Sequence, residues 1–209
     1  MKTEIDGEKV FINKFHTSTL IKSPIMISIG RFKDIPKFLA EVKYNKGVEV
    51  GVFEGNYSNH LLKYNPNLTL YGVDIWTLYK GYNDYHSGQI EAAKKKAYDL
   101  YKKYGSRAIP IEKPSNVAVL DFEDESLDFV FIDGNHNYES CVEDVALWSK
   151  KVKKGGLIFG HDYDDYSNSR RWRDMNVINA IDGWTKSYKI EPWFVTTNNK
   201  NRCWLFFKK

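Results

Sequence analysis

The sequence has 209 residues and a mass of 24.4 kDa, and its 42% hydrophobic and 28% charged residues are typical of a globular protein rather than a disordered chain. The 31 Lys and Arg residues exceed the 27 Asp and Glu residues by four, and most of them are lysine, which favours a solvated surface over a nucleic-acid-binding face. No apolar run approaches the roughly 20 residues of a membrane-spanning helix, the first residues lack a secretory signal, and two cysteines are too few for a disulfide framework. We therefore expect one cytoplasmic domain with no nucleic-acid or membrane partner.

Runs of β-branched and aromatic residues alternate with helical stretches, a pattern typical of α/β proteins. In chain order, the predicted strands are 48–52, 68–73, 107–111, 127–132, 156–160, 191–197 and 202–207. The predicted helices are 30–46, 56–64, 87–104, 138–152 and 174–187. The last two strands flank an Asn-Asn turn and are expected to form an antiparallel hairpin. We expect a mostly parallel seven-stranded sheet with one antiparallel partner at its edge, in which residues 1–46 form an N-terminal cap or helical extension and residues 47–209 form the core.

The strongest local signal is the segment VEVGVFEGNYSNHLL, residues 48–62. Gly51 and Gly55 permit a tight turn and let the backbone approach a ligand at the carboxyl end of a strand. Their G-x-x-x-G spacing differs from the G-x-G-x-x-G of nicotinamide dinucleotide sites, and Glu49 would repel a pyrophosphate. A ligand with a cationic centre suits this carboxylate better. Asp74, which ends the next strand, is placed to accept the hydroxyl groups of a ribose.

These residues resemble the first two motifs of class I S-adenosylmethionine-dependent methyltransferases, E-V-G-x-x-x-G-x-x-S and a strand ending in Val-Asp. The segments FVFIDGNHNYE (129–139) and KGGLIFGHDY (154–163) are similar to motifs of one branch of that family, and VINAID (177–182) is similar to a helix of the same branch. The branch includes small-molecule and sugar O-methyltransferases, many of them dependent on a divalent metal. The resemblance implies a three-layer, Rossmann-like methyltransferase fold and O-methylation of a small-molecule, sugar or glycan hydroxyl.

The resemblance also implies where S-adenosyl-L-methionine, the cofactor of that family, would bind. The positions that match are Glu49, Gly51 and Gly55 around the methionine part, Ser58 at the start of the next helix, Asp74 at the ribose, Ile75 and Trp76 beside the adenine, Ser115 at the adenine edge, and Asp133 beside the sulfonium.

Two aspartates, Asp133 and Asp162, end neighbouring predicted strands, and parallel strands bring their carboxyl ends to the same edge of a sheet. We therefore expect the two side chains to converge, with His136 and His161 nearby. Oxygen ligands suit Mg²⁺, whereas imidazoles favour a transition metal. Catechol-type O-methyltransferases supply one acid from the fourth strand and an acid–amide pair from the fifth, and Tyr163 stands in place of the amide here. Asp164 or Asp165 would substitute for the amide, and the expected ligands of Mg²⁺ or another divalent cation are Asp133, Asp162 and Asp164.

Catalysis is expected at His136, Asp133 and His161. An imidazole titrates near neutral pH and is able to accept the proton of a substrate hydroxyl. The alternative is that each histidine only forms structural hydrogen bonds. The arginine-rich segment 170–173 is either a clamp for an anionic group of the substrate or a solvated loop.

Other functions remain open at this point. A non-catalytic cofactor-binding module and a nicotinamide-linked oxidoreductase are the main alternatives, and the N/D-P-P-Y motif of many nucleic-acid methyltransferases does not occur after the fourth strand. The partner that we expect is a small-molecule or glycan acceptor, in a protein that assembles as a homo-oligomer, as metal-dependent relatives often do.

Overall fold

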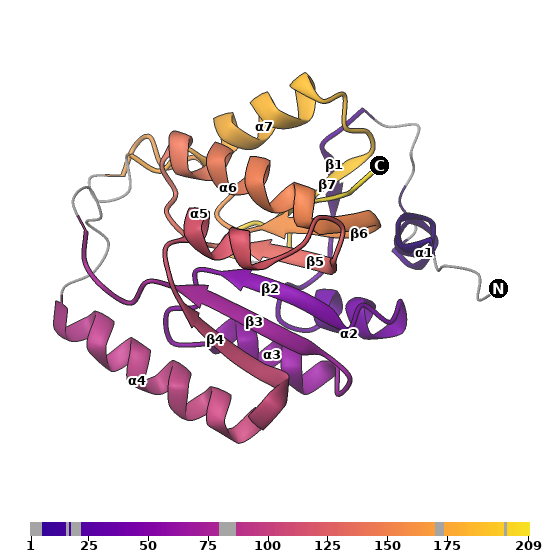
Figure 1. The fold of residues 1–209 in the computed structure, drawn as a ribbon. Coiled ribbons are helices and arrows are strands. Elements are labelled where there is room, and N and C mark those ends of the chain that lie inside the picture. Colours follow the sequence, from indigo (N-terminus) through magenta and orange to yellow (C-terminus); the bar gives the residue numbers. More distant parts are fainter. Residues whose placement is uncertain (1–5, 16, 18–21, 80–86, 170–173, 199) are drawn as a thin grey trace.

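One eight-stranded sheet forms the middle of the protein, as a computed structural model shows for residues 6–15, 17, 22–79, 87–169, 174–198 and 200–209 (Figure 1). The strand order is β1-β7-β8-β6-β5-β2-β3-β4. The strands are β1 (Ile25–Ile27), β2 (Lys46–Val50), β3 (Thr69–Asp74), β4 (Ala108–Glu112), β5 (Leu127–Ile132), β6 (Val152–Gly160), β7 (Trp193–Thr196) and β8 (Trp204–Phe207). Only the pairs that involve β8 are antiparallel, so the expectation of a mostly parallel sheet with a C-terminal hairpin is confirmed.

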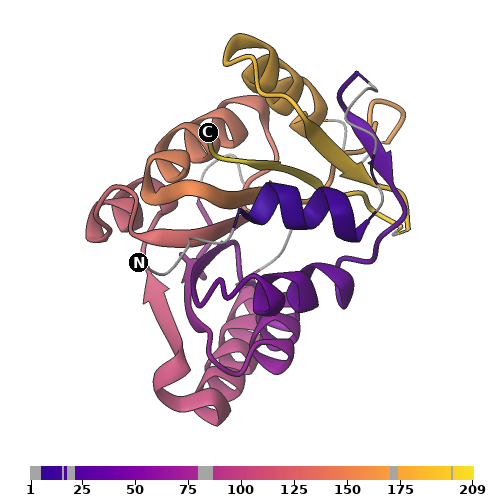
Figure 2. The same cartoon turned by 90° about the vertical axis from the view of Figure 1, so that its right-hand side faces the viewer.

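Helices cover both faces of this sheet, which gives the three layers expected for the fold (Figures 1 and 2). On one face lie α1 (Gly7–Lys14), α2 (Asp34–Glu41), α3 (Asn56–Tyr64) and α4 (Ser87–Tyr104). On the other face lie α5 (Ser115–Ala118), α6 (Tyr138–Lys151) and α7 (Val177–Ser187). None of the helices in the described ranges is both long enough and apolar enough to cross a bilayer.

The alternation of side chains along the strands produces two separate cores. In β5, Phe129 and Phe131 join the core with α1 to α4, whereas Val130 and Ile132 join the core with α5 to α7. All four side chains are buried because β5 lies in the centre of a sheet that is covered on both faces. Burial of such aliphatic and aromatic side chains, worth about 25 cal/mol per Å² of apolar surface, is the main force that holds the layers together.

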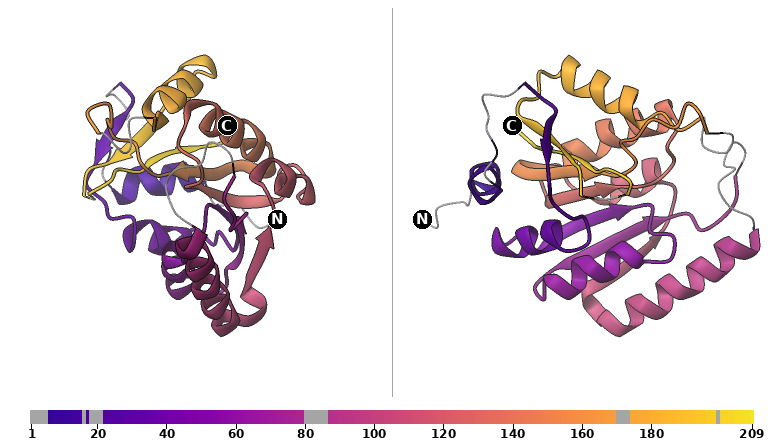
Figure 3. Two further views of the ribbon diagram at one scale, coloured as in Figure 1. Left: turned by 90° about the vertical axis from the view of Figure 1, so that its left-hand side faces the viewer. Right: turned by 180° about the vertical axis from the view of Figure 1, so that it is seen from behind.

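The sheet differs from the sequence prediction at its C-terminal edge. β8 lies inside the sheet, between β6 and β7, and the short strand β1 pairs in parallel with β7 outside it (Figure 3). The prediction of seven strands and of an antiparallel partner at the edge was therefore wrong in this region. β1 has three residues and α5 has four, so neither is long enough to show a periodic pattern, and α1 was not assigned separately within the expected N-terminal cap or helical extension.

The register of the parallel strands aligns their carboxyl ends. Val50 pairs with Ile132, which pairs with Gly160, so the next residue of each strand, Gly51, Asp133 or His161, emerges at the same edge. Backbone hydrogen bonds continue this alignment past the strands, since the Asp133 N–H donates to the Val50 carbonyl and the His161 N–H donates to the Ile132 carbonyl. The carboxyl-end edge of the sheet is where ligands bind in open α/β folds.

Candidate active site

A cavity of about 790 Å³ opens along this edge of the sheet, a size typical of small-molecule sites. Its wall includes most of the residues singled out in the sequence: Glu49, Gly51, Asp74, Ile75, Trp76, Ser115, Asp133, His136, His161 and Asp162. Gly55, Ser58 and Asp164 are not part of this wall. The segment 170–173 lies outside the described residues.

In the part of the cavity wall formed by β2, Glu49 is held by two hydroxyl groups. Ser58 donates a hydrogen bond to the Glu49 carboxyl group, and the Ser58 and Tyr101 hydroxyl groups lie 2.8 Å apart. Glu49 is only 2% exposed, and this burial raises its pKa from 4.5 to about 8, with the Ser58 hydrogen bond acting in the opposite direction. Ser58 therefore supports Glu49 rather than facing the cavity itself. Tyr101 lies on α4, 43 positions after Ser58, and no motif in the sequence points to it.

Asp74 is fixed by the turn that follows β2. One carboxylate oxygen accepts the backbone N–H groups of Val52 and Phe53 at 3.0 and 2.8 Å, and the other accepts that of Trp76 at 2.8 Å. A carboxylate offers about four acceptor positions, so at least one remains for a ligand hydroxyl. Burial raises the Asp74 pKa, and the hydrogen bonds from the Phe53, Trp76 and Val52 N–H groups oppose that rise.

Ser115 is already bonded to the protein. Its hydroxyl donates to Asp144 and accepts the indole N–H of Trp148 at 2.8 Å. Asp144 lines the cavity next to Ser115 and is nearly buried, which raises its pKa to about 6 against the effect of the Ser115 hydrogen bond. Asp144 and Trp148 both lie on α6, and the structure brings them into contact with Ser115.

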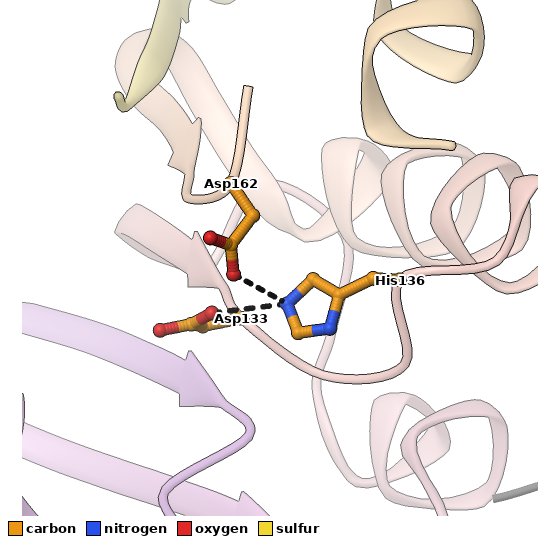
Figure 4. Close-up of side chains that lie close together, drawn as sticks. All are labelled: Asp133, His136 and Asp162. Carbon is orange, nitrogen blue, oxygen red and sulfur yellow. Dashed lines mark hydrogen bonds and ion pairs between the residues drawn. The ribbon is translucent and has the colours of Figure 1, made fainter. Parts of the chain in front are cut away.

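At the carboxyl ends of β5 and β6, two aspartates and two histidines of the cavity wall form a compact group, here called the Asp–His cluster: Asp133, His136, His161 and Asp162. The Nε2 atom of His136 lies 3.2 Å from Asp133 Oδ1 and 3.1 Å from Asp162 Oδ2 (Figure 4). The Nδ1 atom of His161 lies 3.4 and 3.2 Å from the same two oxygens. One ligand atom each from Asp133, His136 and Asp162 lies within 4.8 Å of the others, a spacing able to hold a metal ion. The prediction that the carboxyl ends of β5 and β6 bring these groups together is confirmed.

Local backbone geometry places Asp162 in this cluster. Asp162 follows β6 with a φ of +56°, a left-handed conformation that is costly for a residue other than glycine and that occurs preferentially at functional sites. Tyr166 and Asn201 donate hydrogen bonds to Asp162 Oδ1 at 2.8 and 2.7 Å. Both side chains line the cavity, and both were missed in the sequence because they come from loops.

The charges of the cluster stabilise one another. Burial opposes ionisation of both carboxyl groups, but the two imidazoles outweigh it, so the pKa values of Asp133 and Asp162 fall below the usual range. Burial likewise opposes charging of His136 and His161, yet the two carboxylates outweigh it and raise both imidazole pKa values. Arg31, from the loop before α2, adds a further positive charge 3.7 Å from Asp133 Oδ2.

Asp164 does not join the cluster, contrary to the sequence prediction. Its carboxylate accepts the backbone N–H and the side-chain Nε–H of Arg202, both at 2.7 Å. Charge-assisted bonds of this kind are strong, and they turn Asp164 toward β8. His136 occupies the place that was expected for Asp164. Tyr163 is a packing residue, since its hydroxyl donates to Asp182 and its ring lies against Trp193.

Comparison with known proteins places this cavity in a family. Residues 48–163, more than half of the chain, match the family model Methyltransf_24, described as a methyltransferase domain. The chain belongs to this methyltransferase family. The matched segment of the methyltransferase domain runs from β2 to Tyr163 and so includes Glu49, Asp74 and the whole Asp–His cluster.

Individual relatives are distant. The uncharacterized protein R132 of Acanthamoeba polyphaga mimivirus is 30% identical over 152 residues, which are 70% of this methyltransferase-family chain and 63% of R132. The chain thus spans less than two thirds of that relative. An O-methyltransferase family protein from Burkholderia thailandensis has a TM-score of 0.59 at 14% identity and covers 87% of this chain and 53% of its own. The SAH-bound methyltransferase PaMTH1 from Podospora anserina has a TM-score of 0.60 at 14% identity, over 84% of this chain and 77% of its own. These structures share the fold.

Proposed function

We propose that this protein is an S-adenosylmethionine-dependent O-methyltransferase that acts on a hydroxyl group of a small molecule, sugar or glycan with the help of a divalent cation. The observation that carries the proposal is that one cavity is lined both by Glu49 and Asp74, on β2 and β3, and by the Asp–His cluster, at the carboxyl ends of β5 and β6. Membership of a methyltransferase family and the fold shared with the SAH-bound PaMTH1 support this choice of cofactor.

Glu49, Asp74 and the residues near them fit the cofactor by their chemistry. Glu49 is a buried carboxyl group that suits the cationic methionine part, and Asp74 has acceptor capacity left for the ribose hydroxyl groups. Ile75 and Trp76 would flank the adenine, and Ser115 with Asp144 would lie at its edge. Gly51 would act through its close approach to Asp133, and Gly55 and Ser58 would act indirectly, by starting α3 and by orienting Glu49.

The Asp–His cluster would hold the acceptor and its proton. Methyl transfer from a sulfonium is an in-line displacement, so alignment of the acceptor oxygen and exclusion of water are the main tasks of the protein. S-adenosylmethionine, when bound, supplies an electrophilic methyl group. In a metal-free site, His136 or His161 would take the acceptor proton only above the imidazole pKa that Asp133 and Asp162 raise, and the two carboxylates would stabilise the resulting imidazolium. A divalent cation would be held by Asp133 and Asp162 with His136, and it would lower the pKa of the acceptor hydroxyl.

The cavity wall also has the features of a site for a small molecule with polar groups. The wall carries aromatic rings from Phe32, Tyr57 and Tyr166 and the amide of Asn201. Such rings pack against flat or sugar-like ligands, and the amide adds hydrogen-bonding specificity.

Binding measurements on the purified protein test the cofactor directly. Isothermal calorimetry should detect S-adenosylmethionine and S-adenosylhomocysteine but not NAD⁺, which would distinguish the methyltransferase from a nicotinamide-linked enzyme. Asp74→Asn should weaken binding about tenfold or more, because it removes a charge-assisted bond. Asp99→Asn, which changes an exposed acid paired with Lys95 on α4, is the matched control. Absence of binding by both sulfur compounds would overturn the cofactor assignment.

The transfer step is tested with methyl-labelled S-adenosylmethionine and a panel of catechols, free sugars and oligosaccharides. Label transferred to an oxygen of one class identifies the acceptor. Cofactor binding without transfer to any member of a broad panel would instead favour a non-catalytic binding module.

A further inference from the structure

We infer that the Asp–His cluster is a mixed nitrogen–oxygen metal site for a first-row transition ion, with His136 and His161 as ligands beside Asp133 and Asp162, and that it discriminates against Mg²⁺. This inference deepens the proposed function, on which it rests, by naming the class of cation that the site would select.

The first argument for a metal site is the spacing of the donor atoms. Each imidazole nitrogen faces the same two carboxylate oxygens, and the four N···O separations lie between 3.1 and 3.4 Å. Two atoms bound to one ion at 2.0–2.1 Å lie about 2.9 Å apart when their bonds meet at a right angle and about 3.4 Å apart in a tetrahedral arrangement. Each imidazole nitrogen is therefore spaced from both carboxylate oxygens as a neighbouring ligand of a single ion, and ligand atoms of Asp133, His136 and Asp162 lie within 4.8 Å of one another.

The second argument comes from the groups that contact the two carboxylates. Each aspartate presents one oxygen to both imidazoles, Oδ1 of Asp133 and Oδ2 of Asp162. The other oxygen of Asp162 accepts hydrogen bonds from Tyr166 and Asn201, and the other oxygen of Asp133 faces Arg31 at 3.7 Å. Outer groups that hold one carboxylate oxygen and so orient the second are typical of metal sites. The contacts that these outer groups make with both aspartates are an observation separate from the spacing of the donor atoms.

The third argument comes from the chemistry of the donors. Mg²⁺ takes few protein ligands, prefers oxygen and retains several waters, whereas imidazole nitrogen suits Mn²⁺, Fe²⁺, Co²⁺ and Zn²⁺ increasingly well. Two imidazoles among four donors therefore favour a transition ion. Two carboxylates and two neutral imidazoles would also match the charge of a divalent ion.

Metal titration of the whole protein after removal of metals with EDTA tests this assignment. Co²⁺ should bind with one equivalent and develop visible d–d absorption, and calorimetry should find Co²⁺, Mn²⁺ and Zn²⁺ binding at least about tenfold more tightly than Mg²⁺. His136→Gln and His161→Gln should each weaken Co²⁺ binding by about 10- to 100-fold. His60→Gln is the control, because His60 lies on α3 against the rings of Phe32 and Tyr64, and it should leave Co²⁺ affinity unchanged.

A spectroscopic measurement on the unaltered protein covers the case in which a variant does not fold. Electron spin echo modulation of bound Mn²⁺ should contain the coupling of ¹⁴N nuclei from imidazole ligands. Mg²⁺ binding as tight as Co²⁺ binding, histidine variants with unchanged Co²⁺ affinity, or a Mn²⁺ signal without ¹⁴N coupling would each overturn the inference.

Cofactor binding, measured separately on the same metal-free and Co²⁺-loaded samples, keeps the two proposals apart. If the protein binds Co²⁺ through nitrogen but binds neither S-adenosylmethionine nor S-adenosylhomocysteine, the metal site is supported and the proposed function is overturned. A protein that binds the cofactor but no transition ion would retain the proposed cofactor and lose this metal site.

Discussion

The α-carbon of Gly51 faces the backbone carbonyl of Asp133 so closely that a methyl group at position 51 would lie 2.0 Å from that oxygen. The contact joins the ends of β2 and β5, and both residues line the cavity. Gly51 also has a φ of +87°, which other residues adopt only at a cost. The close approach of the ends of β2 and β5 therefore depends on glycine at this position.

Replacement of Gly51 by alanine should damage both stability and cofactor binding. The left-handed backbone alone costs an alanine about 1–2 kcal/mol, and the clash with the Asp133 carbonyl adds to this. Gly155→Ala is the matched control, since Gly155 has a φ of +74° and a β-carbon there would meet nothing within 4 Å. Urea denaturation and calorimetry of both variants measure the difference. Equal losses in the two variants would mean that the contact with Asp133 is unimportant.

Glu49 should make the stability of the protein depend on pH. Its folded-state pKa of about 8 lies above the value of 4.5 for a free side chain, so the folded protein holds a proton that the unfolded chain releases. The stabilising effect is complete below pH 4.5 and is lost as the pH rises to about 8, at up to about 1.4 kcal/mol for each pH unit. Denaturation curves between pH 5 and 9 should therefore show a smaller decline for Glu49→Gln than for the unaltered protein.

A second acid on the same side of the sheet serves as the control for that measurement. Glu54 pairs with Lys96, and its side chain is 27% exposed. Glu54→Gln should retain the decline between pH 5 and 8. If the Glu49→Gln curve runs parallel to that of the unaltered protein, the buried carboxyl group is not the source of the pH dependence.

Tyr101 should affect cofactor binding although it lies behind the cavity. Tyr101→Phe removes the hydroxyl that contacts Ser58 and leaves the ring in the core, at a cost of about 1 kcal/mol in stability. Tyr104→Phe, on the same helix, removes a hydroxyl that bonds to Asn59 at 2.7 Å, and is expected to cost a similar amount. Calorimetry should find weaker cofactor binding in Tyr101→Phe only. Similar affinities for both variants would argue against a chain of contacts from Tyr101 to Glu49.

Asp162 and Asp164 should behave differently, although they are separated by one residue. Asp162→Asn should abolish transition-metal binding, because it removes a carboxylate of the Asp–His cluster. Asp164→Asn should leave metal affinity within about twofold of the unaltered protein and should cost about 1–3 kcal/mol in stability through loss of the Arg202 bonds. Loss of metal binding in Asp164→Asn would instead show that Asp164 is a metal ligand.

The parallel core of the fold is predictable from the sequence because its strands are regular and well marked. The run from Phe129 to Ile132 is apolar on both faces of the sheet and is followed by Asp133, so both its strand character and its position in the centre of a sheet follow from composition. The place of β8 is not predictable in this way. All four residues of β8 are buried, and such burial fits a strand inside the sheet as well as an edge strand that helices cover. The partner β6 is also distant in the sequence, so no local pattern predicts the pairing.

In the candidate site, too, some residues are predictable from the sequence and others are not. Asp133 and Asp162 are predictable because each follows a strand, and the register of the sheet then brings them together. The contact between Asp164 and Arg202 spans 38 residues, and that between Ser58 and Tyr101 spans 43. No local pattern records which side chains meet across such distances, so the support of the site appears only once the chain is folded.

The interior position of β8 has a consequence for the order in which the protein is completed during translation. β1 and β7 reach the rest of the sheet only through β8, which is the last of the described strands to leave the ribosome. The loop before β8 also supplies Asn201 to Asp162 and Arg202 to Asp164. A nascent chain that stops short of residue 204 thus leaves β6 with an unpaired edge, and the Asp–His cluster acquires its last supporting side chains only as synthesis reaches these residues.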